Sequence, residues 1–176
     1  MLEVICGGMF AGKSELLIHR LKRASYAKKK IVAFKPAIDN RYSVSEIASH
    51  SGQTFKSIAV TSVQEIAMYL LEHDEPEVIG FDEAQFFGEG FDELVNRLSA
   101  IKEVYVAGLD LDSAGNPFGS MPNLLAMADK VTKVSAVCMK CGADATRSQR
   151  LVSNSEQVMV GANGTYEARC RKCWKP

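Results

Sequence analysis

Short apolar runs alternate with amphipathic stretches over residues 2–128 of the chain. Nearly continuous apolar runs bounded by turn-forming residues are typical of strands buried on both faces of a sheet, and such runs cover Leu2–Cys6, 31–34, Val78–Phe81 and 104–109. Between them, apolar residues at helical spacing predict helices over residues 13–28, 62–73, 91–100 and 122–128. This alternation predicts an α/β fold with a parallel sheet and right-handed crossovers.

Two segments depart from this alternation. Residues 39–56 are polar, rich in Asp, Asn, Ser and Gly, and show no clear period, which predicts a long loop of the kind that often serves as a functional lid. After about residue 135 the helical pattern ends, and β-like segments follow at residues 146–152, 157–161 and 166–169. We therefore expect one α/β domain over residues 1–135 and a small C-terminal lobe over residues 136–176.

Composition and charge narrow the function classes. The 176 residues are 47% hydrophobic, enough for one full core and a small appendage. The formal net charge is zero, so no global field attracts nucleic acid or an anionic membrane. No apolar run approaches the roughly 20 residues of a membrane span, and the N-terminus runs straight into a strand without a basic leader. We expect a cytoplasmic protein with no nucleic-acid or membrane partner.

The first predicted strand is followed at once by a glycine-rich phosphate-binding motif, G-x-x-x-x-G-K-[ST]. It consists of Gly7, Gly8, Met9, Phe10, Ala11, Gly12, Lys13 and Ser14, which we call the P-loop (residues 7–14). Backbone N–H groups of such a loop and the N-terminus of the next helix bind nucleotide phosphates. A chance glycine-rich turn would not place Lys13 and Ser14 at this spacing between strand and helix. We expect an ATP site in a P-loop NTPase-type parallel sheet flanked by helices.

Two carboxylates, Asp82 and Glu83, end the apolar run Val78–Phe81. At the carboxyl edge of the sheet, Asp82 would face the phosphates and, with Ser14, hold Mg²⁺. Glu83 could take a proton from water or from an acceptor hydroxyl. The alternative is a pair of solvated acids after a strand, which the neighbouring P-loop makes less plausible.

Cysteine pairs dominate the predicted C-terminal lobe. Two C-x-x-C motifs, with residues 142–169 between them, suit a closed tetrahedral Zn²⁺ site that is structural because four thiolates leave no position for water; their ligands would be Cys138, Cys141, Cys170 and Cys173. Two disulfides or four free thiols are the alternatives, and a chain without a secretion signal disfavours the disulfides. Cys6 stands alone in the first predicted strand and is expected to be a small buried hydrophobe.

These features leave two function classes open, a kinase and a nucleic-acid-stimulated ATPase or zinc-bearing binding module. Basic residues end the first predicted helix and lie beside the last cysteines, and both groups are expected to be solvated rather than to bind nucleic acid. The classes differ in the acceptor, a small-molecule hydroxyl or water. Neutral net charge and the lack of further helicase-like motifs favour the kinase.

The chain closely resembles the type II (cellular and bacterial) thymidine kinase family from Leu2 to Trp174. Five blocks match in the family's order: the Gly-Met-Phe-x-Gly-Lys-Ser loop, Lys35-Pro36-Ala-Ile-Asp39-Asn-Arg41-Tyr42, Asp82-Glu83-Ala-Gln85-Phe86-Phe87, Gly108-Leu109-Asp110 with Pro117-Phe118-Gly119, and Tyr166-Glu-Ala-Arg-Cys170-Arg-Lys-Cys173. The resemblance implies ATP-dependent phosphorylation of the 5′-hydroxyl of thymidine, and also of deoxyuridine, giving dTMP for pyrimidine deoxynucleoside salvage and DNA synthesis.

The resemblance also implies residue roles. Glu83 would be the general base, while Asp39 and Arg41 would belong to the lid, Arg41 with a catalytic role. Substrate-binding positions would be Gln85, the pocket walls Phe86, Leu109 and Phe118, Tyr166 near the deoxyribose, and a base-reading loop of Val158, Met159, Val160 and Gly161.

Assembly and regulation are implied by the same resemblance: a homotetramer, with feedback inhibition by dTTP. The chain differs from the family pattern at two positions. Ser113 stands where the family often has an aromatic residue, and Gly164 stands where it favours an acidic one.

Overall fold

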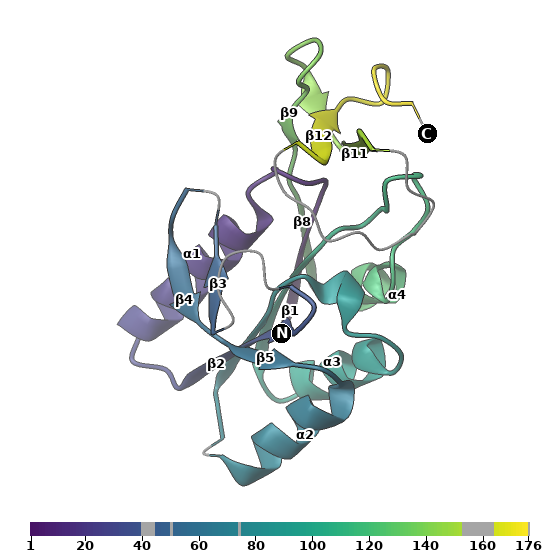
Figure 1. The fold of residues 1–176 in the computed structure, drawn as a ribbon. Helices are drawn as coiled ribbons and strands as arrows, with labels where there is room; N and C mark the ends of the chain where they lie inside the picture. Colours follow the sequence, from purple (N-terminus) through teal and green to yellow (C-terminus); the bar gives the residue numbers. More distant parts are fainter. Residues whose placement is uncertain (40–44, 50, 74, 153–163, 176) are drawn as a thin grey trace.

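A six-stranded, fully parallel sheet forms the body of the computed structural model, which describes residues 1–39, 45–49, 51–73, 75–152 and 164–175 (Figure 1). The sheet order is β5-β2-β6-β7-β1-β8. The strands are β1 (Leu2–Cys6), β2 (Ile31–Pro36), β5 (Ile58–Val60), β6 (Val78–Phe81), β7 (Glu103–Gly108) and β8 (Lys130–Lys133). The expected parallel sheet is confirmed, and both of its edge strands, β5 and β8, were missed by the hydrophobic pattern.

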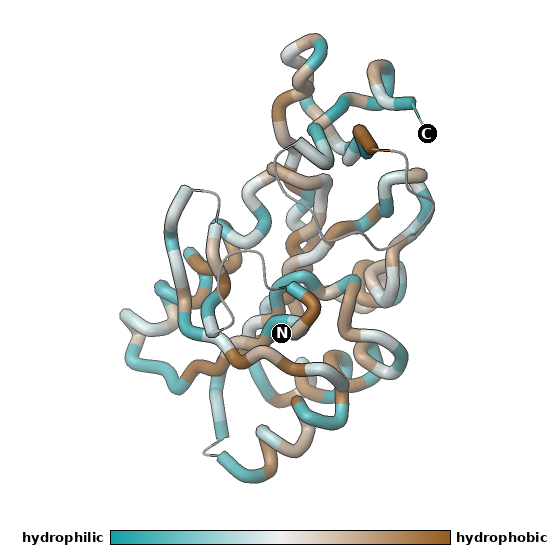
Figure 2. Tube along the Cα trace, in the orientation of Figure 1, coloured by the Kyte–Doolittle hydropathy of each residue, from teal (hydrophilic) through white to brown (hydrophobic). Residues whose placement is uncertain are grey.

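Helices cover both faces of the sheet, because successive strand residues point to opposite sides. On one face, α1 (Lys13–Tyr26) packs Leu17 and Ile18 against Ile5. On the other, α2 (Val63–Glu72), α3 (Phe91–Ser99) and α4 (Met121–Met127) pack against residues that include Val4 and Phe81. Figure 2 shows the brown, hydrophobic segments concentrated in this layered interior. The four predicted helices are confirmed with shifts of one or two residues at most ends.

The predicted loop over residues 39–56 is wrong where a hairpin forms. Strands β3 (Glu46–Ala48) and β4 (Thr54–Lys56) pair antiparallel, with Ile47 opposite Phe55. Ile47 is fully buried against the residues of α1, and Phe55 packs on the same cluster. Two isolated apolar residues, too few to give a readable period, therefore dock the hairpin on the helix.

The C-terminal lobe consists of short antiparallel pairs. Strand β9 (Ala136–Val137) pairs with β10 (Asp144–Ala145), and β11 (Arg147–Arg150) pairs with β12 (Tyr166–Arg169). Strands were expected at 146–152 and 166–169, and both are present, whereas the segment 157–161 lies outside the described residues. The last strand of the large sheet ends at Lys133. The domain boundary near residue 135 stays a prediction.

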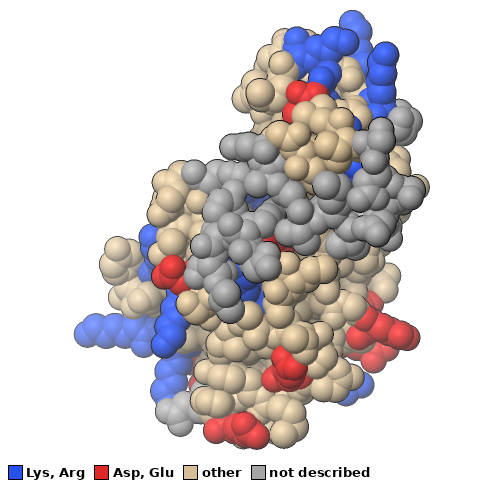
Figure 3. All heavy atoms as spheres, in the orientation of Figure 1, with Lys and Arg blue, Asp and Glu red and all other residues tan. Residues whose placement is uncertain are grey.

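No helix within the described ranges is both long and apolar enough to span a membrane. Figure 3 shows basic side chains gathered at the far end of the C-terminal lobe and, separately, along the side of the molecule where α1 lies. Some cations of the chain have partners: Arg169 pairs with Glu167, and Lys29 pairs with Glu103.

Candidate active site

Glycines give the P-loop its path between β1 and α1. Gly7 has φ 148°, and a Cβ there would lie 2.2 Å from the carbonyl oxygen of Val134, so only glycine fits beside the end of β8. Gly12 adopts a left-handed conformation (φ 80°) directly before the first residue of α1. The loop therefore turns tightly enough to present its backbone at the N-terminus of a 14-residue helix.

The two polar residues that end the motif already have contacts at this site. The Lys13 ammonium donates to the carbonyl oxygen of Gly8 at 2.8 Å, and the side chain is buried. Ser14 Oγ donates to Oδ1 of Asp82 at 3.1 Å. The motif's lysine, its hydroxyl and the carboxylate that ends β6 thus meet at one place, as the sequence predicted, and an oxygen pair of this kind suits Mg²⁺.

Asp82 is almost completely buried at the carboxyl end of β6. Burial and, after it, the adjacent charge of Glu83 raise the pKa of Asp82 to about 7, against the hydrogen bond from Ser14 and the charge of Lys13. Desolvation thus outweighs the favourable contacts in the ligand-free protein. A bound divalent cation would reverse this balance, because it stabilises the ionised carboxylate.

Glu83 occupies a strained turn after β6. Its φ of 50° lies in the left-handed region that non-glycine residues rarely adopt, and such strain is concentrated at functional sites. Glu83 Oε2 accepts a hydrogen bond from Nε2 of Gln85 at 2.6 Å, and Gln85 Oε1 accepts from the backbone N–H of Leu109 at 2.8 Å. Gln85, expected to contact substrate, therefore connects the candidate base to the end of β7.

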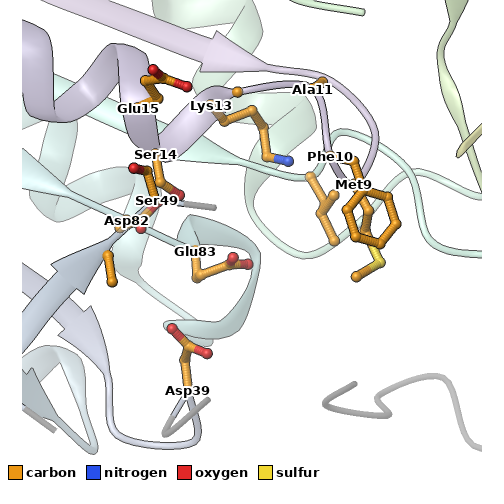
Figure 4. Close-up of a pocket in the computed structure, with 13 residues that line it drawn as sticks. Met9, Phe10, Ala11, Lys13, Ser14, Glu15, Asp39, Ser49, Asp82 and Glu83 are labelled. Atoms are coloured by element: carbon orange, nitrogen blue, oxygen red, sulfur yellow. Dashed lines mark hydrogen bonds between the residues drawn. The ribbon is translucent and has the colours of Figure 1, made fainter. Parts of the chain in front are cut away.

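A cavity of about 270 Å³ joins these groups (Figure 4). Figure 4 shows Asp39 on the far side of Glu83 from the P-loop, at the turn that follows β2. Asp39 is buried and forms an ion pair with Lys35 at 3.1 Å. The cavity is also lined by P-loop residues 9–14, Glu15, the hairpin residues Ala48 and Ser49, Asp82 and Leu109.

The hairpin residues Ala48 and Ser49, which belong to the segment 39–56 predicted as a lid, also line this cavity, although no local motif marks them individually. The predicted lid residue Arg41 lies outside the described residues. The structure therefore brings together the phosphate-binding and acidic residues predicted from the sequence, with the hairpin as an additional wall.

The expected nucleoside walls are only partly assembled. Leu109 lines the first cavity, whereas Phe86 and Phe118 line a second one, of about 570 Å³, with their rings edge to face at 5.5 Å. Tyr166 is buried on β12, where the guanidinium of Arg150 lies 5.5 Å from its ring centre. The expected base-reading residues lie outside the described residues: Val158, Met159, Val160 and Gly161.

Four cysteines converge in the C-terminal lobe, at the ends of β9 and β12 and in the tight turns that follow them. Their sulfur atoms all lie within 4.8 Å of one another: Cys138, Cys141, Cys170 and Cys173. The Cys141–Cys170 separation of 3.7 Å is far too long for a disulfide, and it matches the ~3.8 Å sulfur spacing that Zn–S bonds of about 2.3 Å give in a tetrahedron.

The chemistry of this donor set also suits a soft cation. Burial raises the pKa of the Cys138 thiol, but hydrogen bonds from neighbouring backbone N–H groups outweigh it and bring the pKa down to about 6. Thiolates, not thiols, bind metal. Hydrogen bonds with Cys141 and Cys170 raise the pKa of Cys173 to about 12, so the four thiols share their protons unequally. The sulfur spacing is what makes the cluster compatible with the expected zinc site.

The C-terminal lobe also touches the P-loop, which the sequence did not indicate. The backbone N–H of Met9 donates to Oγ of Ser148 at 3.0 Å, and Ser148 is buried on β11. Phe10 has φ 65°, and both Phe10 and Ala11 pack on the apolar cluster that holds Cys138 and Cys170. Residues far apart in the chain thus shape the phosphate site together.

Comparison with known proteins identifies the family. A family model described as thymidine kinase matches residues 1–174. The chain belongs to the thymidine kinase family. A curated relative within this family, the thymidine kinase of Bacteroides thetaiotaomicron, is 49% identical over 175 residues, which is 98% of this chain and 86% of the relative. The resemblance inferred from the five motif blocks is confirmed.

Solved structures give weaker likenesses. The RuvB Holliday junction branch migration motor of Thermotoga maritima aligns with a TM-score of 0.44 and 14% identity, over 78% of this chain and 39% of that one. Domain III of the Thermotoga maritima replication initiation protein DnaA aligns with a TM-score of 0.42 and 13% identity, over 76% and 54%. Scores this low have no bearing on the activity of this family member.

Proposed function

We propose that the protein transfers the γ-phosphoryl group of ATP to the 5′-hydroxyl of thymidine, and also of deoxyuridine, in a salvage route to dTMP for DNA synthesis. The observation that carries the proposal is a single cavity lined by both Glu83 and the P-loop lysine, Lys13, in a chain of the thymidine kinase family. A phosphate cradle alone would fit many nucleotide-binding proteins, whereas a carboxylate beside it supplies the base that an acceptor hydroxyl needs.

In the proposed reaction, Glu83 accepts the proton of the 5′-hydroxyl as the nucleoside oxygen bonds to the γ-phosphorus. The bond from phosphorus to the bridging oxygen breaks at the same centre, and ADP leaves with that electron pair. Lys13 and the lid residue Arg41 neutralise charge on the phosphoryl oxygens. Ser14 and Asp82 would hold Mg²⁺, which supplies further charge neutralisation when bound.

Nucleoside recognition is assigned to both parts of the chain. Phe86, Leu109 and Phe118 wall the base, and Tyr166 lies near the deoxyribose. Backbone groups of residues 158–161 read the hydrogen-bonding edge of the pyrimidine, and Asp39 belongs to the lid that closes over the phosphates. Closure would exclude water and so favour transfer to the nucleoside over hydrolysis.

Further proposals follow from family membership, composition and the geometry of the cysteine cluster. The cysteine cluster holds one structural Zn²⁺, for which the sulfur spacing is the support. The enzyme is a cytoplasmic homotetramer, dTTP inhibits it by feedback, and nucleic acid and membranes are not partners. The P-loop domain covers residues 1–135 and the C-terminal lobe residues 136–176.

The test is ATP turnover with and without thymidine and with and without DNA, with the nucleoside product identified by mass. We expect thymidine to raise ATP consumption and to appear as its 5′-monophosphate in equal amounts, with no effect of DNA. Lys13→Met should abolish this turnover, while Lys30→Met, at an exposed position, is the matched control. ATP hydrolysis that responds to DNA and ignores thymidine would instead establish the ATPase class.

A further inference from the structure

Trp174 is the sole tryptophan of the chain, and it joins the C-terminal lobe to the loop between β7 and α4. Its indole Nε1–H donates to the carbonyl oxygen of Ser113 at 3.2 Å. A Cβ placed on Gly115 would lie 2.7 Å from Cη2 of the indole. The ring therefore lies directly on a glycine backbone, and any larger residue at position 115 would push it away.

The loop that receives the indole, residues 111–117, is internally fixed. Oδ1 of the buried Asp112 accepts from the backbone N–H groups of Ala114 and Asn116, at 3.0 and 2.9 Å. An isolated β-bridge between Leu111 and Pro117 closes the base of the loop. The 111–117 loop should therefore move as one rigid unit.

This loop lies between two of the proposed nucleoside walls. Leu109 precedes it at the end of β7, and Phe118 follows it directly. The backbone N–H of Phe118 donates to the carbonyl oxygen of Asp110 at 3.2 Å, which couples the two ends. A displacement of the 111–117 loop would therefore move both walls.

On the side of the C-terminal lobe, the indole is held close to the cysteine cluster. The backbone N–H of Trp174 donates to the carbonyl oxygen of Cys170 at 2.9 Å, and the Arg147 guanidinium lies 5.8 Å from the indole ring centre. Arg147 is itself buried, so the indole packs against a side chain that is held in the C-terminal lobe. The contact thus connects the turn that holds two of the cysteines to the 111–117 loop.

We propose that Trp174 is a positioning residue that fixes the C-terminal lobe against the 111–117 loop and thereby sets the distance between the nucleoside walls and the rest of the pocket. The kinetic part of this inference rests on the proposed function. Trp174 does not touch the reacting atoms in this proposal; it acts through the loop, so its loss affects the nucleoside and leaves the ATP site intact.

The kinetic experiment compares Trp174→Ala and Trp174→Phe with the control Tyr26→Ala, which removes an aromatic ring that is 85% exposed at the end of α1. For Trp174→Ala, we expect kcat/KM for thymidine to fall roughly 10- to 100-fold, the scale of a misplaced substrate. The fall should come from a higher KM for thymidine. The KM for ATP should stay within about twofold. Trp174→Phe, which keeps a ring and loses the N–H donor, should lie between parent and alanine variant.

The second experiment needs no turnover. Because Trp174 is the sole tryptophan, steady-state emission reports its contact with the loop directly. Asp112→Ala leaves the C-terminal lobe unaltered and should loosen the loop, so emission should shift to the red and acrylamide quenching should increase. Asp92→Ala, in α3, is the matched control and should leave both unchanged.

Unchanged thymidine constants in Trp174→Ala, or a rise confined to the KM for ATP, would overturn the positioning role. An emission spectrum that is the same in Asp112→Ala as in the parent would also overturn it. If the protein phosphorylated no nucleoside at all, the proposed function would fail while the emission experiment still decided whether Trp174 holds the loop.

Discussion

The backbone N–H of Met9, in the P-loop, donates to Ser148 Oγ, in the C-terminal lobe, at 3.0 Å. The neighbouring Gly8 passes close to the same strand, since a Cβ on it would lie 3.5 Å from the backbone of Arg147. A loop that binds phosphate through its own N–H groups must keep a fixed shape to do so. Part of that shape is therefore supplied by a strand 139 residues further along the chain.

Removing the Ser148 hydroxyl should weaken ATP binding. An unpaired buried N–H costs about 1–3 kcal/mol, so Ser148→Ala should raise the KM for ATP and weaken ADP binding by calorimetry, each by about tenfold. Ser148→Thr keeps a hydroxyl and should restore most of the affinity. Ser99→Ala, whose hydroxyl donates only within α3, is the control. Equal ADP affinities for Ser148→Ala and the parent would show that the contact does not shape the loop.

Replacing Glu83 by glutamine should remove the base and leave the fold. The change keeps size, and the turnover number should fall by about 10²- to 10⁴-fold, the usual contribution of a positioned general base. Nucleotide affinity should stay close to that of the parent, because Glu83 does not contribute to the phosphate cradle. Glu89→Gln, at an exposed position in the following turn, is the control. A turnover number within a few-fold of the parent would exclude Glu83 as the base.

Asp82 should make the free energy of unfolding of the ligand-free protein depend on pH. Its pKa in the folded protein is about 7, above the ordinary aspartate value of 3.8, so the folded state binds a proton more tightly than the unfolded state. The stability from this group is therefore present below about pH 4 and is lost as pH rises through 7. Chemical denaturation of the parent and Asp82→Asn proteins between pH 5 and 8 measures this loss. The free energy of unfolding should fall less steeply with pH in the variant than in the parent.

The same titration should favour Mg²⁺-nucleotide binding at higher pH. A cation needs the ionised carboxylate, so affinity should rise by up to about tenfold per pH unit below 7 and level off above it. Calorimetry in buffers of different ionisation enthalpy should detect one proton released on binding at pH 6. The absence of proton release there, with normal affinity, would mean that Asp82 is already ionised.

Loss of one cysteine ligand should remove the metal and weaken both substrates. Elemental analysis should find one Zn²⁺ per chain in the parent and much less in Cys141→Ser, since three ligands hold structural zinc poorly. Because the C-terminal lobe contacts the P-loop through Ser148, the KM values for ATP and thymidine should both rise. Cys6→Ala, in β1, should keep its zinc. A metal-free parent with normal kinetics would separate the cluster from the active site.

Much of the fold could be predicted because the central strands are nearly continuous apolar runs. The misses have physical reasons. Strand β8 reads Lys130-Val-Thr-Lys133 and is largely exposed, as an edge strand can be, and β5 has only three residues. The β3–β4 hairpin depends on Ile47 meeting α1, a tertiary contact that leaves no period in the sequence.

The candidate site divides in the same way. The sequence predicted the residues that belong to short contiguous motifs directly after predicted strands, namely Lys13, Ser14, Asp82 and Glu83. The contacts of Ser148 with Met9 and of Trp174 with Ser113 could not, since each joins residues distant in sequence through a backbone group that carries no residue signature. The role of Gln85 was also unforeseen, because its bond to Glu83 depends on the strained turn between them.

The central claim is that the acceptor is thymidine, and specificity constants for four nucleosides test it most directly. Thymine presents an N3–H donor between two carbonyl acceptors, whereas cytosine inverts the pattern at two of three places. If residues 158–161 read this edge with fixed backbone groups, each mismatch leaves a buried polar group unpaired at about 1–3 kcal/mol.

The measurement is kcat/KM for thymidine, deoxyuridine, deoxycytidine and deoxyguanosine under one set of conditions. We expect thymidine to be best, with deoxyuridine accepted at a cost of about 1–3 kcal/mol at most for the missing methyl group. Deoxycytidine should be roughly 10²- to 10⁴-fold poorer, and deoxyguanosine should be too large for the pocket. Comparable values for thymidine and deoxycytidine, or ATP turnover indifferent to all four, would contradict the account.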